Sequence, residues 1–336
     1  MSLNTLEEIA SYIVSDGKGI LAADESNPTC TKRFDTIGVE STEESRRDYR
    51  EMLFRSGGIQ GNIGGVILFD ETIRQNAKDG TSLVDLMNSQ GALPGIKVDK
   101  GLQPIGDSDE TVTVGLDGLD ERLKEYSLLG AKFTKWRAVI KIGNNLPTDN
   151  CIDANMKALA DYAKVVQDNG MVPMVEPEVL MEGDHSIEEC FAATERSLKS
   201  LFHHLKENGV NIKGTILKPN MVTSGSTCSN QASINEVAEQ TLECLKANVP
   251  SELPAITFLS GGQSELLATA HLDAMNKIGG FDWKLSFSYG RALQAPTLKA
   301  WMGKPENIFI AQDALSHRAK MNQLAALGQW DKGLED

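Results

Sequence analysis

The sequence lacks the patterns that mark metal-binding, disulfide-rich and membrane-spanning proteins. Its five cysteines are widely spaced and include no CxxC pair, so neither a disulfide framework nor a structural zinc site is indicated. Its five histidines form no HExxH or similar spacing, which disfavours metal-dependent chemistry. No apolar run approaches the length of a membrane span. We therefore expect reduced thiols, no metal or other cofactor, and no membrane association.

Basic residues are scarce, which limits the partners that the chain suits. The 336 residues carry 47 acidic and 33 basic side chains, a formal net charge of −14. So acidic a chain is unsuited to nucleic acids and anionic membranes. A small anionic substrate is compatible with it, because charge is screened over about 8 Å at physiological salt and a local group of cations acts within that range.

The N-terminus lacks the basic start of a secretory signal. Leu6, Ile9, Ala10, Ile13 and Val14 fall on one helical face and predict a packed amphipathic helix. We therefore expect a cytoplasmic protein.

Eight short apolar runs recur roughly every 30–45 residues, which is the length of a βαβ unit. They cover Gly19–Ala23, Gly65–Phe69, Leu93–Val98, Phe133–Ile140, Met171–Val175, Gly214–Leu217, Ala255–Leu259 and Trp283–Phe287. Helical patterns lie between most of them, at Leu116–Leu129, Ile152–Gln167, Ser186–Leu205, Ser233–Leu245, Ser264–Met275 and Ala292–Trp301. Alternating strands and helices predict a parallel sheet, and eight such units predict an α/β protein with a closed (β/α)8 TIM barrel.

An open doubly wound sheet is the alternative architecture, and it is less favoured because no GxGxxG follows the first run. The glycine-rich segment Gly57–Gly65 precedes a predicted strand, so we interpret it as a turn and not as a phosphate loop. We expect residues 1–336 to form a single TIM-barrel domain with an N-terminal helix and a short C-terminal tail that is frayed after about Ala326.

Charged side chains, serines and glycines follow most of the predicted strands. Any one of them alone would be most simply a solvated loop residue, but a barrel brings all eight carboxyl ends to one mouth, where functional residues gather. These residues are Asp24, Ser26, Lys97, Lys135, Arg137, Glu176, Glu178, Lys218, Ser260, Gly261, Gly262, Ser288, Gly290 and Arg291.

The glycines after the seventh and eighth strands predict an anion site. Ser260–Gly262 and Gly290–Arg291 each precede a predicted helix, whose free N–H groups and dipole favour a phosphate group. Arg291 can add a bidentate contact.

The lysines suit nucleophilic chemistry. Burial and a nearby ammonium group lower the pKa of a lysine by roughly 3 units, and only the neutral amine attacks a carbonyl. Lys135 is placed to affect Lys218 in this way, while Glu176 can shuttle protons and Asp24 can accept one from a substrate hydroxyl. Residue types alone leave Lys97, Lys135 and Lys218 all open as the nucleophile.

These residues lie in segments that resemble class I, metal-independent fructose-1,6-bisphosphate aldolases, the Schiff-base aldolase family. The segments follow the family order along nearly the whole chain. They are GKGILAADES (17–26), TEESRRDYR (42–50), IGGVILFDET (63–72), PGIKVDKG (94–101), GLDGLDER (115–122), KWRAVIKIG (135–143), VPMVEPEVL (172–180), LKPNMV (217–222), FLSGGQSE (258–265) and FSYGRALQ (287–294).

The resemblance implies reversible cleavage of fructose 1,6-bisphosphate to dihydroxyacetone phosphate and glyceraldehyde 3-phosphate, in glycolysis and gluconeogenesis. It implies no cofactor, because a protonated imine takes up the electrons that zinc would otherwise stabilise. Expected partners are phosphorylated ketose and triose substrates, and members are often homo-oligomers.

The resemblance also implies a role for each site residue. The expected catalytic residues are Lys218 as the Schiff-base lysine, Glu176 as general acid/base, Glu178 as its supporting carboxylate, Asp24 as base for the C4 hydroxyl, and Lys135 as stabilising cation. The phosphate next to the ketone is expected at Ser260, Gly261, Gly290 and Arg291, and the distal phosphate at Ser26, Arg33 and Lys97. Arg137, Gly262 and Ser288 are expected to contribute to substrate or phosphate binding.

Two features depart from the family pattern. Many members end in a tyrosine that assists proton transfer on the enamine, but no tyrosine follows Tyr289 here, so we expect another group or water to supply that proton. Asn27–Cys30 stands beside the distal phosphate site, where other members often have a turn richer in glycine and serine.

Three alternatives remain open. The same chemistry could act mainly on sedoheptulose 1,7-bisphosphate or fructose 1-phosphate. A non-catalytic barrel scaffold is a second, although it would not need the lysine, glutamate and aspartate set. A phosphate-sugar isomerase is a third, and it would need a glutamate base but no nucleophilic lysine.

Overall fold

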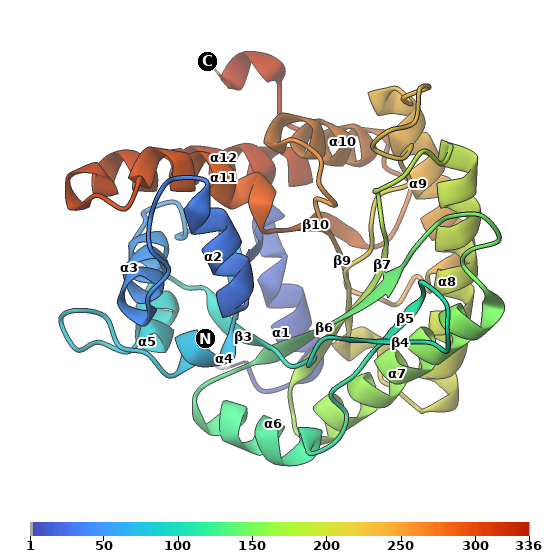
Figure 1. The fold of residues 1–336 in the computed structure, drawn as a ribbon, viewed down its shortest axis with the longest axis horizontal. Coiled ribbons are helices and arrows are strands. Elements are labelled where there is room, and N and C mark those ends of the chain that lie inside the picture. The colour runs from blue at the N-terminus through green and yellow to red at the C-terminus, as the bar shows by residue number, and fades with distance from the viewer. Residues whose placement is uncertain (1–2, 336) are drawn as a thin grey trace.

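Eight parallel strands close into a barrel in the computed structural model, which describes residues 3–335. Around the barrel the order is β1-β10-β9-β8-β7-β6-β3-β2 (Figure 1), so the predicted (β/α)8 fold is confirmed. These strands are β1 Gly19–Ala23, β2 Ile63–Leu68, β3 Leu93–Lys97, β6 Phe133–Ile140, β7 Val172–Val179, β8 Ile216–Leu217, β9 Ala255–Phe258 and β10 Lys284–Tyr289.

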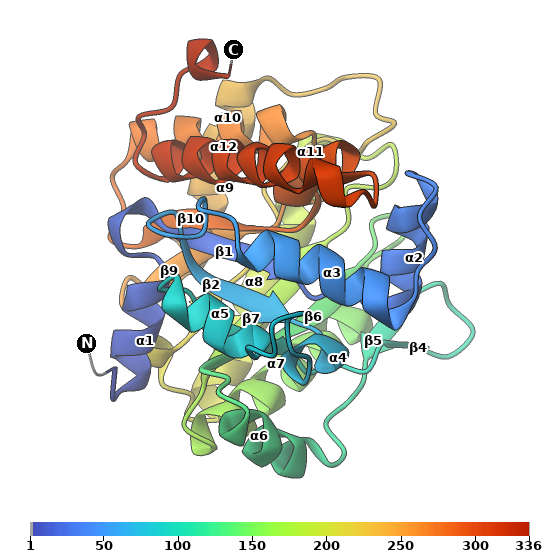
Figure 2. The same cartoon turned by 90° about the vertical axis from the view of Figure 1, so that its left-hand side faces the viewer.

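Helices surround the strands, with α10, α11 and α12 together along one side of the barrel in both views (Figures 1 and 2). The helices are α1 Leu6–Ile13, α2 Asn27–Asp35, α3 Glu43–Phe54, α4 Asp70–Ile73, α5 Leu83–Ser89, α6 Leu119–Leu128, α7 Asp149–Asp168, α8 Ile187–Glu207, α9 Ile234–Asn248, α10 Glu265–Ile278, α11 Arg291–Trp301 and α12 Ile308–Ala326. Short 3-10 helices are η1 Ser15–Gly17, η2 Ile212–Gly214, η3 Pro305–Asn307 and η4 Lys332–Leu334. In residues 3–335, no helix combines the length and the apolar character needed to cross a bilayer.

The strands alternate between the two sides of the barrel wall, as β6 illustrates. Phe133 packs into the barrel interior and Lys135 lies two residues further along the same face. Thr134 and Trp136 point outward to α7, where the Thr134 hydroxyl lies 2.6 Å from the Tyr162 hydroxyl and the Trp136 ring stacks obliquely on the Tyr162 ring. The alternation therefore places Trp136 on the outer face of the strand, against a helix, and the charged Lys135 on the inner face, where it lines the cavity.

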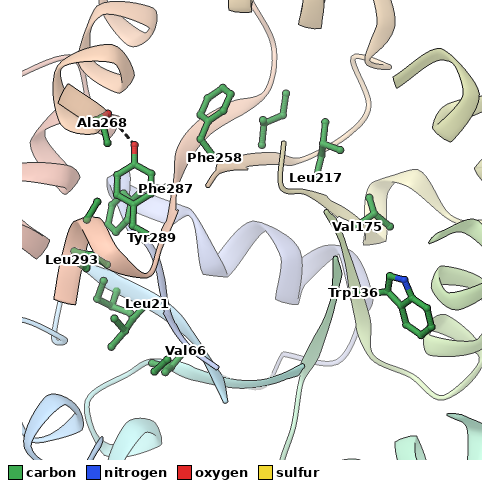
Figure 3. Close-up of a cluster of buried hydrophobic side chains, with 14 of the residues drawn as sticks. Leu21, Val66, Trp136, Val175, Leu217, Phe258, Ala268, Phe287, Tyr289 and Leu293 are labelled. Carbon is green, nitrogen blue, oxygen red and sulfur yellow. Dashed lines mark hydrogen bonds between the residues drawn. The ribbon is translucent and has the colours of Figure 1, made fainter. Parts of the chain in front are cut away.

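Two apolar layers hold this arrangement. The outer layer lies between strands and helices and includes Leu21, Val66, Val175, Leu217 and Phe258 (Figure 3). The inner layer fills the amino end of the barrel, where the apolar face of α1 packs against strand residues. Because apolar side chains fill that end, the polar strand ends are left to line a cavity at the opposite end.

A two-stranded hairpin outside the barrel was not predicted. It pairs β4 Leu102–Pro104 with β5 Thr111–Thr113. Each strand has three residues and β4 is exposed, so neither forms an apolar run. The Thr113 hydroxyl donates to the backbone carbonyl of Arg137 at 2.7 Å, which joins the hairpin to β6.

The prediction that the chain frays after about Ala326 is wrong for the described residues. Trp330 is buried, and its backbone N–H donates to Asp273 in α10 at 3.0 Å. Glu335 forms an ion pair with the buried Arg318 of α12. These contacts are made by single polar groups, which produce no periodic pattern in a sequence.

Candidate active site

A cavity of about 220 Å³ opens at the carboxyl ends of the strands. Its lining residues are Ala22, Asp24, Glu25, Ser26, Thr29, Arg33, Lys97, Lys135, Arg137, Glu176, Glu178, Lys218, Leu259, Ser260, Gly261, Ser288, Gly290 and Arg291. Every residue predicted for the site lines this cavity except Gly262, which follows Gly261 in the same turn. Residues from distant parts of the chain therefore meet as the barrel prediction required.

Two lysines and two carboxylates form the buried centre of the cavity. The Nζ atom of Lys218 lies 3.1 Å from Oε1 of Glu176, and Nζ of Lys135 lies 3.5 Å from Oε2 of the same carboxylate. Lys135 also lies 2.7 Å from Oδ2 of Asp24. Since both lysines and Glu176 are almost fully buried, each charge is compensated by a neighbour and not by water.

These ion pairs set the protonation states. Burial alone would raise the pKa of Asp24 and Glu176, but the nearby ammonium groups of Lys135 and Lys218 outweigh burial and hold both pKa values below their usual range. Burial alone would lower the pKa of Lys135, but Asp24 and Glu176 raise it above its ordinary value. At neutral pH both carboxylates are therefore ionised and Lys135 is cationic.

Strand register brings these residues side by side. Lys97 of β3 is paired with Lys135 of β6, and Arg137 of β6 is paired with Glu176 of β7. Arg137 forms an ion pair with Glu178 at the rim. Burial would lower the pKa of Arg137, but the Glu178 carboxylate outweighs burial and raises this pKa above its ordinary value. The guanidinium therefore keeps its charge.

One end of the cavity is formed by the turn after β1 and by α2. Ser26 occupies the position before the first residue of α2, and its hydroxyl lies 3.1 Å from the hydroxyl of Thr29. Arg33 and Lys97 add cationic side chains, with Arg33 paired to Glu25 and Lys97 lying 3.4 Å from Asp99. Two hydroxyls at the N-terminus of α2 and two cations that line the same cavity suit a phosphate group.

A second end of the cavity is built from the turns after β9 and β10. It lies close to the first, because a Cβ atom on Gly290 would lie 3.7 Å from Nη2 of Arg33. Gly261 and Gly262 have positive φ values of 55° and 90°, a conformation that favours glycine, and Gly290 directly precedes the first residue of α11. The Ser288 hydroxyl is buried and has no hydrogen-bond partner among the described residues. With Arg291 beside this turn, the second end also offers N–H groups, a hydroxyl and a cation to an anion.

Glu25 and Thr29 line the cavity but were not predicted to do so. Glu25 follows Asp24 directly, and its carboxylate contacts Arg33, the buried Arg50 and the side-chain amide of Gln294. Thr29 could have been predicted from its spacing, because it lies three residues after Ser26 and therefore on the same side of a helix. The contacts of Glu25 come from α3 and α11, which no local pattern connects.

The fold and the cavity together define an α/β barrel whose candidate active site contains two buried lysines beside carboxylates. A family model described as fructose-bisphosphate aldolase class-I matches residues 5–336. The chain therefore belongs to the class I fructose-bisphosphate aldolase family.

Individual relatives agree with this family over most of their length. The chain is 54% identical over 332 residues to a probable fructose-bisphosphate aldolase class 1 of Xanthomonas axonopodis pv. citri, covering 98% of this chain and 99% of the relative. It is 51% identical to cytosolic fructose-bisphosphate aldolase 4 of Arabidopsis thaliana, covering 95% and 82%. A solved fructose-bisphosphate aldolase structure from Plasmodium falciparum superposes with a TM-score of 0.96 at 47% identity, covering 98% and 95%.

Proposed function

We propose that this chain cleaves fructose 1,6-bisphosphate reversibly, with Lys218 as the residue that forms the Schiff base. The observation that carries the assignment is the 3.1 Å contact between Lys218 Nζ and Glu176 Oε1 inside a cavity whose lining includes two groups of residues suited to anions. Lys135 is engaged by both Asp24 and Glu176, and Lys97 lies towards the distal end near Asp99. Lys218 is therefore the amine best placed for attack.

Glu176 serves the formation of the imine. It accepts a proton from the Lys218 ammonium group, and the neutral amine then adds to the C2 carbonyl to give a carbinolamine. The same carboxyl group returns the proton to the C2 hydroxyl, which leaves as water and gives a protonated imine. Glu178 pairs with Arg137 at the rim and is the supporting carboxylate of this site.

Asp24 and Lys135 serve the cleavage of the carbon–carbon bond. Asp24 accepts the proton of the C4 hydroxyl, the C3–C4 bond breaks, and its electron pair moves into the protonated imine to form an enamine. Glyceraldehyde 3-phosphate leaves as the aldehyde. Lys135 stays cationic throughout and stabilises the negative charge that develops next to it.

The enamine must then be protonated at C3 and the imine hydrolysed to release dihydroxyacetone phosphate. We propose that Glu176 or water supplies the proton, because the described residues that line the cavity include no tyrosine. The C1 phosphate is assigned to Ser260, Gly261, Gly262, Ser288, Gly290 and Arg291. The distal phosphate is assigned to Ser26, Arg33, Lys97 and Arg137.

Trapping with borohydride tests the nucleophile. The protein is incubated with dihydroxyacetone phosphate, reduced, digested and analysed by mass spectrometry. We expect irreversible inactivation and added mass on the peptide that contains Lys218, with no trapping in Lys218→Met. The matched control is Lys213→Met, an exposed lysine five residues upstream, which should be trapped like the wild type. Mass on Lys135 or Lys97, or activity that disappears with EDTA, would contradict the proposal.

The same measurements distinguish the alternatives. A scaffold or an isomerase would show no trapped lysine. Comparing kcat/KM for fructose 1,6-bisphosphate, sedoheptulose 1,7-bisphosphate and fructose 1-phosphate ranks the substrates, and we expect the first to be preferred because both ends of the cavity offer an anion site. We also propose a cytoplasmic location, a single-domain chain and a homo-oligomer. The location is supported by relatives that are named as cytosolic or cytoplasmic.

A further inference from the structure

The strand that leads to Lys218 is unusually short. β8 contains only Ile216 and Leu217, and it is paired with Met174 and Val175 of β7. The last ladder bond on this side runs from the backbone N–H of Lys218 to the carbonyl of Val175 at 2.8 Å. Lys218 therefore lies at the point where the sheet ends between β7 and β8.

Proline explains why the ladder ends there. If the register continued, the N–H of residue 177 would donate to the carbonyl of Lys218, as parallel pairing requires. Residue 177 is Pro177, which has no N–H group. Residue 219 is also proline, so Lys218 is flanked by positions that cannot extend the sheet in the usual way.

Beyond the end of the ladder, the side chain of Asn220 replaces a backbone carbonyl as hydrogen-bond acceptor. Its Oδ1 accepts from the backbone N–H of Val179 at 3.0 Å, a bond that the backbone carbonyl of Asn220 would accept in a regular ladder. Its Nδ2 donates to Thr194 Oγ1 of α8 at 3.0 Å and to the Met221 carbonyl at 3.1 Å. Asn220 is buried, so water cannot replace these bonds.

We propose that Asn220 is a positioning residue for Schiff-base formation, because it fixes the distance between β7, which carries Glu176, and the segment that carries Lys218. On the other side, the N–H of Leu259 donates to the carbonyl of Pro219 at 3.1 Å and ties the same segment to the end of β9. Without the Val179 bond, the bond from the Lys218 N–H to Val175 would be the last backbone rung between the described residues of this segment and β7. This inference rests on the proposed role of Lys218.

Three variants test it in the full-length enzyme. Asn220→Leu removes the acceptor at similar volume, and Asn220→Asp keeps an oxygen that can accept from Val179 and from a rotated Thr194 hydroxyl. Thr194→Val removes the contact to α8 but leaves the bond to Val179 intact. The readouts are kcat, KM for fructose 1,6-bisphosphate and the single-turnover rate of borohydride trapping on Lys218, each corrected for the folded fraction.

We expect Asn220→Leu to lower kcat and the trapping rate together by roughly 10- to 100-fold, because misplacement of a reacting group by about 1 Å has effects of that size. KM should change by less than about threefold, since the phosphate sites are untouched. Asn220→Asp should recover most of the rate, and Thr194→Val should retain wild-type kcat.

Two results would overturn the inference. One is a folded Asn220→Leu enzyme with wild-type kcat and trapping rate. The other is an equal loss of rate in Thr194→Val, which would indicate a purely structural role. If Asn220→Leu does not fold, Asn220→Ser, whose hydroxyl is too short to reach Val179, replaces it with the same expected loss. Absence of trapping in the wild type would instead contradict the assignment of Lys218.

Discussion

The ammonium nitrogen of Lys135 lies 2.7 Å from Oδ2 of Asp24 and joins β6 to the end of β1 across the mouth of the barrel. The two strands are not neighbours, because β3 and β2 lie between them. The pair therefore spans the cavity and does not extend a ladder. It keeps Asp24 ionised and Lys135 cationic at neutral pH.

Loss of the Lys135 charge should slow catalysis and shift its pH dependence. In Lys135→Met, Asp24 and Glu176 lose a cation that lowers the pKa of each, so both pKa values rise. We expect kcat to fall by roughly 10²–10³-fold, and the acid limb of the kcat–pH profile to move to higher pH. Lys135→Arg keeps the charge and should leave the acid limb in place. A Met variant with an unshifted acid limb would show that Lys135 does not control these carboxylates.

Asp24 should also make stability depend on acid pH. Its pKa is lower in the folded protein than the ordinary value of 3.8. The corresponding stabilisation is therefore fully present above about pH 4 and is lost as pH falls through the folded-state pKa. Asp24→Asn removes this contribution. Urea unfolding at pH 7 and pH 3 should give a smaller difference in unfolding free energy for the variant than for the wild type.

The sequence was sufficient for the parts of the site that lie on regular elements. Period-two alternation places Lys135 and Arg137 on one face of β6, and the closed barrel then brings them to the same cavity as Lys218. The same alternation placed Trp136 on the outer wall, where it packs on Tyr162 of α7.

Features that depend on single side-chain contacts between distant segments could not be predicted. The direction of Glu25 is set by Arg50 and Gln294, which lie on two other helices. The packing of the last residues depends on Trp330 and on the pair between Glu335 and Arg318. Each is an isolated polar contact, whereas periodicity reports only the repeated burial of apolar faces.

The glycine turn after β9 should control substrate affinity. Gly262 has a φ of 90°, and a Cβ atom there would lie 3.5 Å from Nη2 of Arg291. The contact with Arg291 is an ordinary van der Waals separation, so the effect comes from the positive φ: Gly262→Ala should strain the turn and shift groups assigned to the C1 phosphate. We expect KM for fructose 1,6-bisphosphate to rise roughly tenfold, equivalent to the loss of about one hydrogen bond to a charged group.

Gly280→Ala is the matched control for that measurement. Gly280 follows α10, has a φ of 75° and does not line the cavity, so alanine meets the same backbone strain away from the site. Both variants should lose about 1–2 kcal/mol of stability, but only Gly262→Ala should raise KM. An equal change in KM would indicate that strain alone, and not the phosphate turn, is responsible.

The pair between Arg50 and Glu25 should be far more important for stability than an ion pair on the surface of the same helix. Arg50 is 1% exposed, and its Nη2 donates to the Glu25 carbonyl at 2.8 Å and lies 3.5 Å from its carboxylate. In Arg50→Met the buried carboxylate and carbonyl lose a cationic donor, and we expect a loss of about 3–5 kcal/mol. Arg47 of α3 pairs with Asp48 with 23% of its side chain exposed, and Arg47→Met should cost less than about 1 kcal/mol. Urea denaturation of both variants measures the difference, and equal losses would mean that Glu25 needs only Arg33 and Gln294 to remain buried.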